Sequence, residues 1–355
     1  MKPLDDAKFS GTKAVDEKLK INTSKLQPWI DGNVKNAGKI KSIEQFKGGQ
    51  SNPTYKIITE SKNLVLRRKP PGKLLPSAHA VDREYKVITA LYNTDVPVPK
   101  TYGFCENDDI AGTAFFVMDF LDGDLFWDPM IPSMKNNDRT EIYQNKNKIL
   151  AKLHSIDFKK IGLEDYGKPG NYVARQVSRW SKQYKASETD NIEAMNNLIE
   201  WLPKNLPAEQ DTTIVHGDFR LDNMIFDKKN NSVVAILDWE LSTLGNPIAD
   251  FTYHMMSWRL PVGARGMGIM GADLQKLNIP KEDEYAELYY KKTGRTKIQN
   301  WDFYMAYNIF RLAGIAQGIV GRVRDGTASS AQAKEYESFV PILGKLGWNI
   351  VESLN

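Results

Sequence analysis

Two neighbouring apolar runs that end on acidic and amide residues constrain this sequence most. Residues 214–226 predict an apolar strand, a polar loop that carries Asp218 and Asn223, and a second apolar strand. Residues 233–238 predict another apolar strand, which ends on Asp238. Phosphoryl transfer needs one carboxylate to accept the proton of an attacking hydroxyl group, and oxygen ligands to hold Mg²⁺ against the nucleotide phosphates. The pattern therefore favours an enzyme that uses ATP and Mg²⁺ to phosphorylate a hydroxyl group.

The residue types suggest separate roles. Asp218 is predicted to be the catalytic base, because a simple turn residue would not need the other polar groups around it. Asn223 and Asp238 are expected to share the Mg²⁺ ion. Arg220 has two interpretations. It could be a catalytic residue that neutralises charge on the transferring phosphate, or it could form a surface ion pair with Asp222.

A cation for the nucleotide phosphates is expected on the third predicted strand. Alternation along this strand places Val65 and Arg67 on one face, so that Val65 lines the adenine site and Arg67 reaches the phosphates. Glu84, on the next predicted helix, is the expected ion-pair partner of Arg67. Arg68 and Lys69 are the alternative cations.

Two further segments are expected to contact the nucleotide. The loop between the first two strands could cover the phosphates with its backbone N–H groups, and its place just before the strand of Arg67 favours this role; a plain hairpin turn is the alternative. Its candidate residues are Gly48, Gly49, Ser51 and Asn52. The run at 117–121 resembles the hinge of kinases, and that resemblance implies that its backbone holds the adenine edge. Its candidates are Met118, Asp119 and Phe120.

The pattern His-Gly-Asp-x-x-x-x-Asn at residues 216–223 resembles the catalytic loop of protein kinases. It is most similar to that of the aminoglycoside/choline phosphotransferase superfamily, where glycine occupies the middle position of the kinase His-Arg-Asp. The resemblance implies an α+β, protein-kinase-like fold of two lobes. The N-lobe should have a five-stranded antiparallel sheet with one helix, and the C-lobe should be mainly helical. The expected segments are a helical extension (1–40), the N-lobe (41–121) and the C-lobe (122–355).

The same resemblance implies two supporting residues. His216 should pack beneath the catalytic loop and brace the metal-binding aspartate. Asp250, in the run Gly-Asn-Pro-Ile-Ala-Asp at 245–250, should hydrogen-bond the loop from the following helix.

The acceptor is indicated by charge. Residues 254–330 contain eleven Lys or Arg and seven Asp or Glu residues, mixed with Met and Trp. Such a surface would repel a polycation and favour an apolar anion. Arg259, Arg265 and Arg311 are the candidate acceptor-binding residues. Residues 66–85, 236–247 and 310–318 are similar to the kinase-like domain found fused to acyl-CoA dehydrogenases. That resemblance implies a hydroxy acid or hydroxyacyl-CoA as acceptor. The alternatives are an aminoglycoside or amino-alcohol kinase and a nucleotide-binding pseudokinase.

Composition excludes several other classes of protein. The net charge of +4 is spread along the chain without a basic tail, so a nucleic-acid partner is not expected. No apolar run is long enough to span a membrane, and the N-terminus has no signal-like apolar segment. The single cysteine, Cys105, is expected in the core of a cytoplasmic protein. Nothing in the sequence indicates a protein partner.

Overall fold

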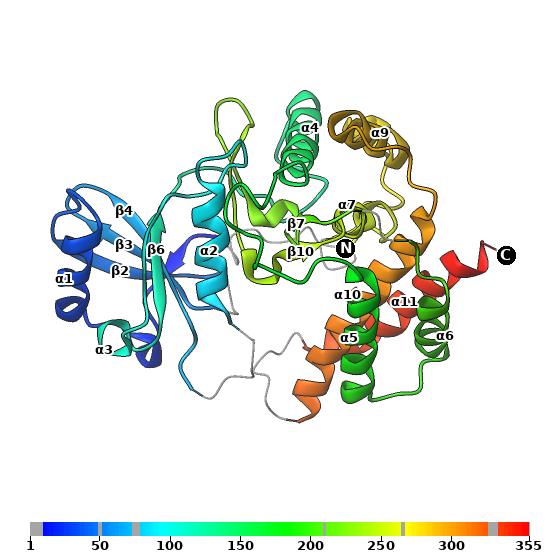
Figure 1. The fold of residues 1–355 in the computed structure, drawn as a ribbon, viewed down its shortest axis with the longest axis horizontal. Coiled ribbons are helices and arrows are strands. Elements are labelled where there is room, and N and C mark those ends of the chain that lie inside the picture. Colours follow the sequence, from blue (N-terminus) through cyan, green and yellow to red (C-terminus); the bar gives the residue numbers. More distant parts are fainter. Residues whose placement is uncertain are drawn as a thin grey trace.

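The structure is a computed structural model that describes residues 10–48, 52–72, 79–208, 211–263, 267–325 and 333–354. Figure 1 shows a smaller lobe built on an antiparallel sheet beside a larger, mainly helical lobe. The sheet order is β1-β2-β3-β4-β6-β5. Its strands are β1 (Thr12–Lys13), β2 (Ile40–Phe46), β3 (Thr54–Thr59), β4 (Asn63–Arg68), β5 (Thr101–Cys105) and β6 (Phe115–Asp119). The predicted kinase-like fold of two lobes is confirmed.

All five predicted strands of the small lobe are present, and the structure adds a sixth. β1 pairs antiparallel with the end of β2, so that Thr12 faces Phe46. Two residues at the sheet edge carry no alternating pattern, so the sequence did not predict this strand. The predicted helix after the third strand is α2 (Val81–Leu91).

The two faces of the sheet have separate cores. On the outer face, Leu64 and Leu66 pack with Leu26 and Ile30 of α1 (Thr23–Asn33). The short helix α3 (Asp108–Ala111) joins the same core. On the inner face, Val65 belongs to a cluster that runs through α2 into the large lobe. The alternation predicted for β4 therefore exists. Helix α1 lies within the predicted helical extension (1–40) and covers the outer face of the sheet. The predicted segment boundaries at 40 and 121 remain predictions.

The large lobe places four short strands among helices. The strands are β7 (Thr213–Val215), β8 (Met224–Phe226), β9 (Val233–Ile236) and β10 (Thr243–Gly245). The helices are α4 (Asn136–Leu153), α5 (Tyr172–Ser187), α6 (Glu193–Trp201), α7 (Pro247–Met255), α8 (Leu274–Leu277), α9 (Glu282–Thr293), α10 (Trp301–Arg324) and α11 (Ala333–Glu352).

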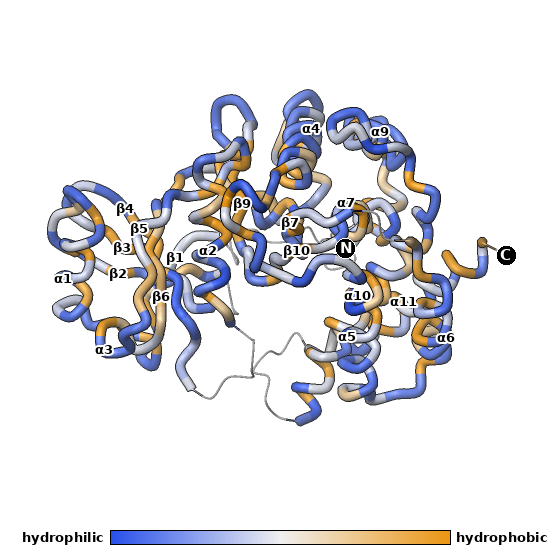
Figure 2. Tube along the Cα trace, viewed as in Figure 1, coloured by the Kyte–Doolittle hydropathy of each residue, from blue (hydrophilic) through white to orange (hydrophobic). Residues whose placement is uncertain are grey.

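Hydropathy follows this arrangement. In Figure 2, β6 is largely hydrophobic, whereas α4 and α9 at the periphery are mostly hydrophilic. The central helix α10 is buried along most of its length, as its apolar sequence predicts. Cys105 is free and buried, also as predicted. Among the described residues, no helix combines the length and the hydrophobicity that crossing a membrane would require.

The packing of α1 predicts a stability effect. Ile30 is 0% exposed in the outer core, so Ile30→Ala should lower the free energy of unfolding by about 2–5 kcal/mol. Ile342 is 49% exposed, and Ile342→Ala is the matched control, with an expected change within about 0.5 kcal/mol. Chemical denaturation followed by circular dichroism measures both. Equal stabilities for the two variants would show that α1 does not contribute to the core.

Candidate active site

The loop at residues 216–223 runs between two pairs of short strands. β7 pairs with β10, and β8 pairs with β9. The loop leaves the end of β7 and returns into β8. The N–H group of Leu237 donates to the carbonyl oxygen of Asn223 at 2.8 Å. This bond holds Asp238, the next residue, beside the loop. The two sequence stretches predicted to carry the chemistry therefore lie together.

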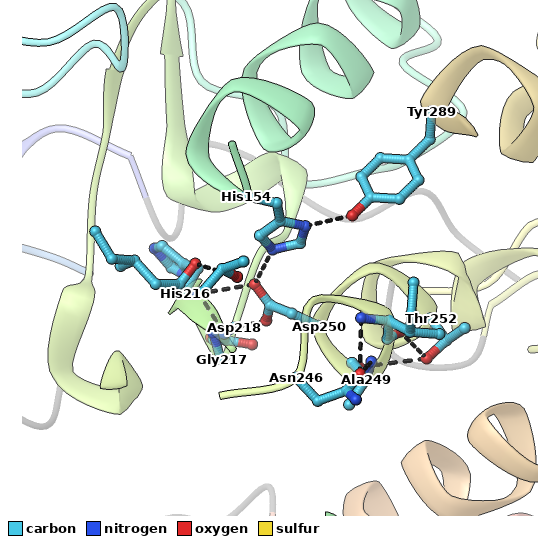
Figure 3. Close-up of polar contacts among 12 residues, drawn as sticks. His154, His216, Gly217, Asp218, Asn246, Ala249, Asp250, Thr252 and Tyr289 are labelled. Atoms are coloured by element: carbon cyan, nitrogen blue, oxygen red, sulfur yellow. Dashed lines mark hydrogen bonds and ion pairs between the residues drawn. The ribbon is translucent and has the colours of Figure 1, made fainter. Parts of the chain in front are cut away.

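Asp250 holds the first residues of the loop from helix α7 (Figure 3). Its carboxylate accepts the N–H groups of His216 and Gly217, both at 2.8 Å. The helix begins with a cap, because the side chain of Asn246 accepts two N–H groups of its first turn. A rigid helix start thus presents a carboxylate to the loop backbone. These are the hydrogen bonds that the sequence predicted for Asp250.

A buried histidine completes this contact. The Nε2 atom of His154 lies 3.1 Å from Asp250, and its Nδ1 atom lies 2.7 Å from the hydroxyl of Tyr289 (Figure 3). Burial raises the pKa of Asp250, but the interactions with His154 and His216 together outweigh this effect and leave the pKa below its usual value. Burial also lowers the pKa of His154. A neutral imidazole therefore donates to an ionised carboxylate. The sequence analysis missed both His154 and Tyr289, since each looks like an ordinary core residue on a helix.

Gly217 has no room for a side chain. Its φ angle is +83°, in the left-handed region, and a Cβ atom would lie 2.7 Å from the carbonyl oxygen of Leu241. Since even alanine would be strained there, the chain requires glycine in the middle of His-Gly-Asp.

His216 packs beneath the loop, as predicted. Its Nδ1 atom accepts the N–H group of Asp218 at 3.2 Å, and its Nε2 atom lies 2.9 Å from the carbonyl oxygen of Leu237. Its ring also lies 4.7 Å from that of Trp239, measured between centroids. His216 therefore braces the backbone on both sides of the site rather than the carboxylate of Asp238.

The carboxylate of Asp218 is held by three side chains. Its Oδ1 atom accepts the hydroxyl of Tyr253 at 2.7 Å and lies 3.1 Å from Nε of Arg220. Its Oδ2 atom accepts the amide group of Asn223 at 3.1 Å. Burial raises the pKa of Asp218, but the charge of Arg220 and the hydroxyl of Tyr253 outweigh this effect, and the pKa lies below its usual value. Asp218 is therefore ionised at neutral pH. Tyr253 was missed, because its position on an apolar helix resembles a core position.

Of the two predicted roles of Arg220, the ion pair with Asp222 is present, whereas the contact with the transferring phosphate stays a prediction. Besides Asp218, Arg220 pairs with Asp222 at 2.9 Å through NH2. The pair is not a simple surface ion pair, since the Asp222 side chain is only 15% exposed.

Arg67 connects the two lobes. Its Nε atom donates to Glu84 and its NH2 group donates to Asp238, both at 2.7 Å. NH1 lies 3.2 Å from the hydroxyl of Thr54. The ion pair with Glu84 is the one that the sequence predicted. Arg68 points to the opposite face of the sheet, as alternation requires.

The nucleotide-side residues lie near this cation. Val65 pairs with Met118 across β4 and β6, on the inner face of the sheet. Asp119 accepts the hydroxyl of Tyr102 at 2.6 Å. Phe120 stacks on the ring of Phe46. Of the predicted phosphate loop, Gly48 and Asn52 are described and flank the loop, whereas Gly49 and Ser51 lie outside the described residues. Asn52 is buried, and its Oδ1 atom lies 3.1 Å from Nδ1 of His79.

The donor set is compatible with Mg²⁺. Asn223 uses its amide nitrogen to bond Asp218, so its side-chain oxygen is the atom that remains for a metal. Asp238 supplies a carboxylate at the start of the next segment. Within the described ranges, no group of three or more His, Cys, Asp or Glu side chains could hold a metal ion by itself. Mg²⁺ is commonly held by one or two carboxylates together with phosphate oxygens and water, which fits a site that only a nucleotide completes.

The structure does not support two of the predicted acceptor-binding residues. Arg259 forms a two-point ion pair with Glu282, at 2.6 and 2.8 Å, which neutralises its charge. Arg311 is buried, donates to the carbonyl oxygen of Gly217 at 2.6 Å, and lies over the ring of Tyr253. It therefore supports the catalytic loop from α10. Arg265 lies outside the described residues. The sequence could not show that Arg259 and Arg311 already have partners.

The comparisons with known proteins agree with this geometry. The model of the phosphotransferase enzyme family matches residues 42–288. A mouse (Mus musculus) protein, acyl-CoA dehydrogenase family member 10, is 43% identical over 341 residues, which cover 95% of this chain and 32% of the relative. Human (Homo sapiens) acyl-CoA dehydrogenase family member 11 is 37% identical over 334 residues, which cover 92% of this chain and 43% of the relative. The chain thus spans less than half the length of these curated relatives.

Solved structures show the same fold. A Ralstonia eutropha protein, provisionally assigned as an aminoglycoside phosphotransferase, is 47% identical with a TM-score of 0.86, covering 94% of this chain and 99% of that chain. A spectinomycin phosphotransferase in complex with ADP and spectinomycin is 14% identical with a TM-score of 0.61, covering 93% and 98%. At that identity the second likeness is one of fold alone. The family match and the close relatives show that this chain belongs to the phosphotransferase enzyme family.

Proposed function

We propose that this phosphotransferase uses ATP and Mg²⁺ to phosphorylate the hydroxyl group of a hydroxy acid or hydroxyacyl-CoA. One observation carries the proposal. Asp218, Asn223 and Asp238 form a connected set in the large lobe, and Arg67 reaches that set from the small lobe. An interaction module that only bound nucleotide would not need a carboxylate held in position by Tyr253. We also place the protein in a reducing compartment such as the cytoplasm, because Cys105 is a free thiol.

Asp218 is the proposed proton acceptor. An ionised carboxylate with a fixed orientation can hydrogen-bond the acceptor hydroxyl and take its proton as the bond to phosphorus forms. Tyr253 and Arg220 both engage Oδ1, so they fix the rotation of the carboxylate. Because Arg220 also carries a positive charge beside this group, it can stabilise negative charge on the transferring phosphoryl group.

Arg67, Asn223 and Asp238 are the proposed nucleotide and metal residues. Mg²⁺, when bound, supplies positive charge that neutralises the phosphate oxygens. Asn223 and Asp238 would hold the ion, and Arg67 would contact the phosphates. Glu84 keeps the guanidinium of Arg67 oriented, since the two buried groups are in direct contact at 2.7 Å. The backbone at Met118, adjacent to Val65, would contact adenine.

A hollow lined by Arg220 and Tyr253, which both contact Asp218, supports the proposed acceptor class. The apolar lining of the hollow comes from Trp127, Pro129, Met256, Leu260 and Met267, and its charged lining comes from Arg220, Lys146 and Asp222, two cations and one carboxylate. This lining suits an apolar molecule with an anionic group and would repel a polycation. The relatives named as acyl-CoA dehydrogenase family members support acyl chemistry. The Ralstonia protein favours the alternative, an aminoglycoside kinase, so both classes must be tested.

A substrate screen tests the proposal. The purified protein is incubated with MgATP and hydroxy acids, acyl-CoAs, amino alcohols or aminoglycosides, and phosphorylated products are detected by mass spectrometry. We expect products from hydroxyacyl compounds and none from kanamycin-like antibiotics. Efficient phosphorylation of aminoglycosides without any hydroxy-acid product would refute the acceptor class. MgATP binding without turnover of any compound would support a pseudokinase instead.

The proton-acceptor role predicts a selective loss of turnover. Asp218→Asn keeps the shape of the side chain but removes its basicity, so kcat should fall by about 10²–10⁴-fold while nucleotide binding persists. Asp227→Asn, in the turn between β8 and β9, is the control and should leave kcat unchanged. Steady-state kinetics and calorimetry with MgATP measure the two effects. Near wild-type turnover in Asp218→Asn would exclude this role.

The phosphate-cation role predicts a difference between two adjacent arginines. Arg67→Ala should weaken MgATP binding by about 10–100-fold, because charge-assisted hydrogen bonds are lost. Arg68→Ala should leave the Kd near that of the wild type but lower the melting temperature, since NH2 of Arg68 donates to the carbonyl oxygen of Leu19 on the outer face. Calorimetry and thermal unfolding separate these effects. If Arg68→Ala lost more affinity for MgATP than Arg67→Ala, the phosphate contact would lie on the outer face of the sheet, and its assignment to Arg67 would be wrong.

A further inference from the structure

Helix α4 carries a buried lysine that the catalytic machinery described above does not use. Lys146 is 3% exposed, although it lies on a helix that is mostly hydrophilic (Figure 2). Lys148, two residues further along, is exposed. The side chain of Lys146 lines the hollow beside the catalytic loop. Lysine is rarely buried unless it has a partner, so this position needs an explanation.

Lys146 has no close counter-ion in the described part of the chain. No carboxylate oxygen there lies within ion-pair distance of its ammonium group, the charge of Asp222 acts on it only from further away, and the ring of Tyr143 lies 5.8 Å from it. Asp222 lines the same hollow, but its carboxylate is paired with Arg220 at 2.9 Å. Burial lowers the pKa of Lys146 to about 7; the negative charge of Asp222 opposes this shift only in part, and the charge of Arg220 adds to it.

An unpaired buried ammonium group destabilises the fold. Its desolvation is costly unless a negative charge comes close. A neutral side chain such as methionine would fill the same space without this penalty. Groups kept in such an unfavourable state beside a catalytic carboxylate are candidates for binding substrate.

The hollow connects Lys146 with the residues that hold Asp218. Tyr253 and Arg220 both line it, and they contact the Asp218 carboxylate at 2.7 and 3.1 Å. The hollow has a volume of about 30 Å³, which suits a compact group such as a carboxylate, so a group bound there would contact Lys146 and lie beside the residues that hold the proposed proton acceptor. The apolar side chains of Met256 and Met267 form part of the wall between these polar groups.

We propose that Lys146 binds the carboxylate of the acceptor and thereby selects a free hydroxy acid. This inference rests on the proposed function, since it names the residue that recognises the anionic group. A carboxylate is compact and carries a single charge, which matches a single ammonium group. A doubly charged phosphate would be repelled more strongly by Asp222. The acceptor hydroxyl then points towards Asp218, while the carbon chain contacts the apolar wall.

Three variants test this assignment. Lys146→Met removes the charge at similar length, and Lys146→Arg keeps it. Lys148→Met is the matched control from the exposed side of the same helix. The probes are straight-chain hydroxy acids with the hydroxyl group at different positions, and the methyl ester of each acid. Initial rates give kcat and KM for each probe and for ATP, and thermal unfolding gives the stability of each variant.

The expected result is a selective change. Lys146→Met should raise the KM for the acids by about 10–100-fold and leave the KM for the esters and for ATP unchanged. Its melting temperature should equal or exceed that of the wild type, because a buried unpaired charge is removed. Lys146→Arg should restore the preference for acid over ester. Lys148→Met should behave as the wild type.

The pH dependence gives a second readout. For the wild type, 1/KM for the acid should fall as the pH rises above about 7, where free Lys146 loses its proton, and this fall should be absent in Lys146→Arg. His254, Tyr253 and Tyr143 also face Lys146, but the directions of their pKa shifts do not explain this fall in 1/KM. Burial lowers the pKa of His254 well below its usual value, whereas it raises the pKa of both Tyr253 and Tyr143. Burial also raises the pKa of Asp222, but Lys146→Arg retains Asp222 and Arg220.

The outcomes separate the two proposals. If the wild type phosphorylates hydroxy acids and Lys146→Met does so with an unchanged KM, the role of Lys146 is refuted while the proposed function stands. If Lys146→Met lost activity equally on acids and esters and had a lower melting temperature, Lys146 would be a structural partner of Asp222. That result would also refute its role in binding the acceptor. If the wild type phosphorylates no hydroxy acid, the proposed function fails and the assignment of Lys146 fails with it.

Discussion

The buried carboxylate of Asp250 is the contact on which the catalytic loop depends. It satisfies two consecutive backbone N–H groups, those of His216 and Gly217, and it receives a hydrogen bond from His154. Without it, two donors would be buried without partners, which costs about 1–3 kcal/mol for each group. Because the bonds are present before any substrate arrives, the position of Asp218 is set by the fold. Little reorganisation is then needed during the reaction.

A second interaction carries this order to the small lobe. Arg67 is shared by Glu84 of α2 and Asp238 of the large lobe, so one guanidinium links the sheet and α2 to the catalytic strands. A bound nucleotide would add phosphate charge beside the same group and compete with Asp238 for it. Arg67 would therefore couple the arrangement of the lobes to the occupancy of the site, alongside other contacts between the lobes such as that of Arg83 with the carbonyl oxygen of Tyr166.

Local patterns made much of this site predictable. Strand alternation is enough to place Arg67 and Arg68 on opposite faces, and helix order is enough to bring Glu84 to the first of them. Which carboxylate pairs with a lysine or arginine side chain depends instead on tertiary packing. Nothing in the sequence showed that Glu282 neutralises Arg259. Lys146 was overlooked for the same reason, because a lysine on a hydrophilic helix is normally solvated. The edge strand β1 was missed because a strand of two residues is too short to show an alternation of apolar and polar side chains.

Gly217 limits how this loop can change in evolution. A protein kinase has arginine at the middle position of His-Arg-Asp, but here the left-handed backbone and the nearby Leu241 carbonyl exclude even a methyl group. Gly217→Arg would therefore require the segment after Asp238 to move at the same time. A single codon change cannot convert one loop type into the other without passing through a damaged enzyme. Sequences intermediate between the His-Gly-Asp loop and the His-Arg-Asp loop would therefore be impaired, even though the two loops carry the same catalytic aspartate.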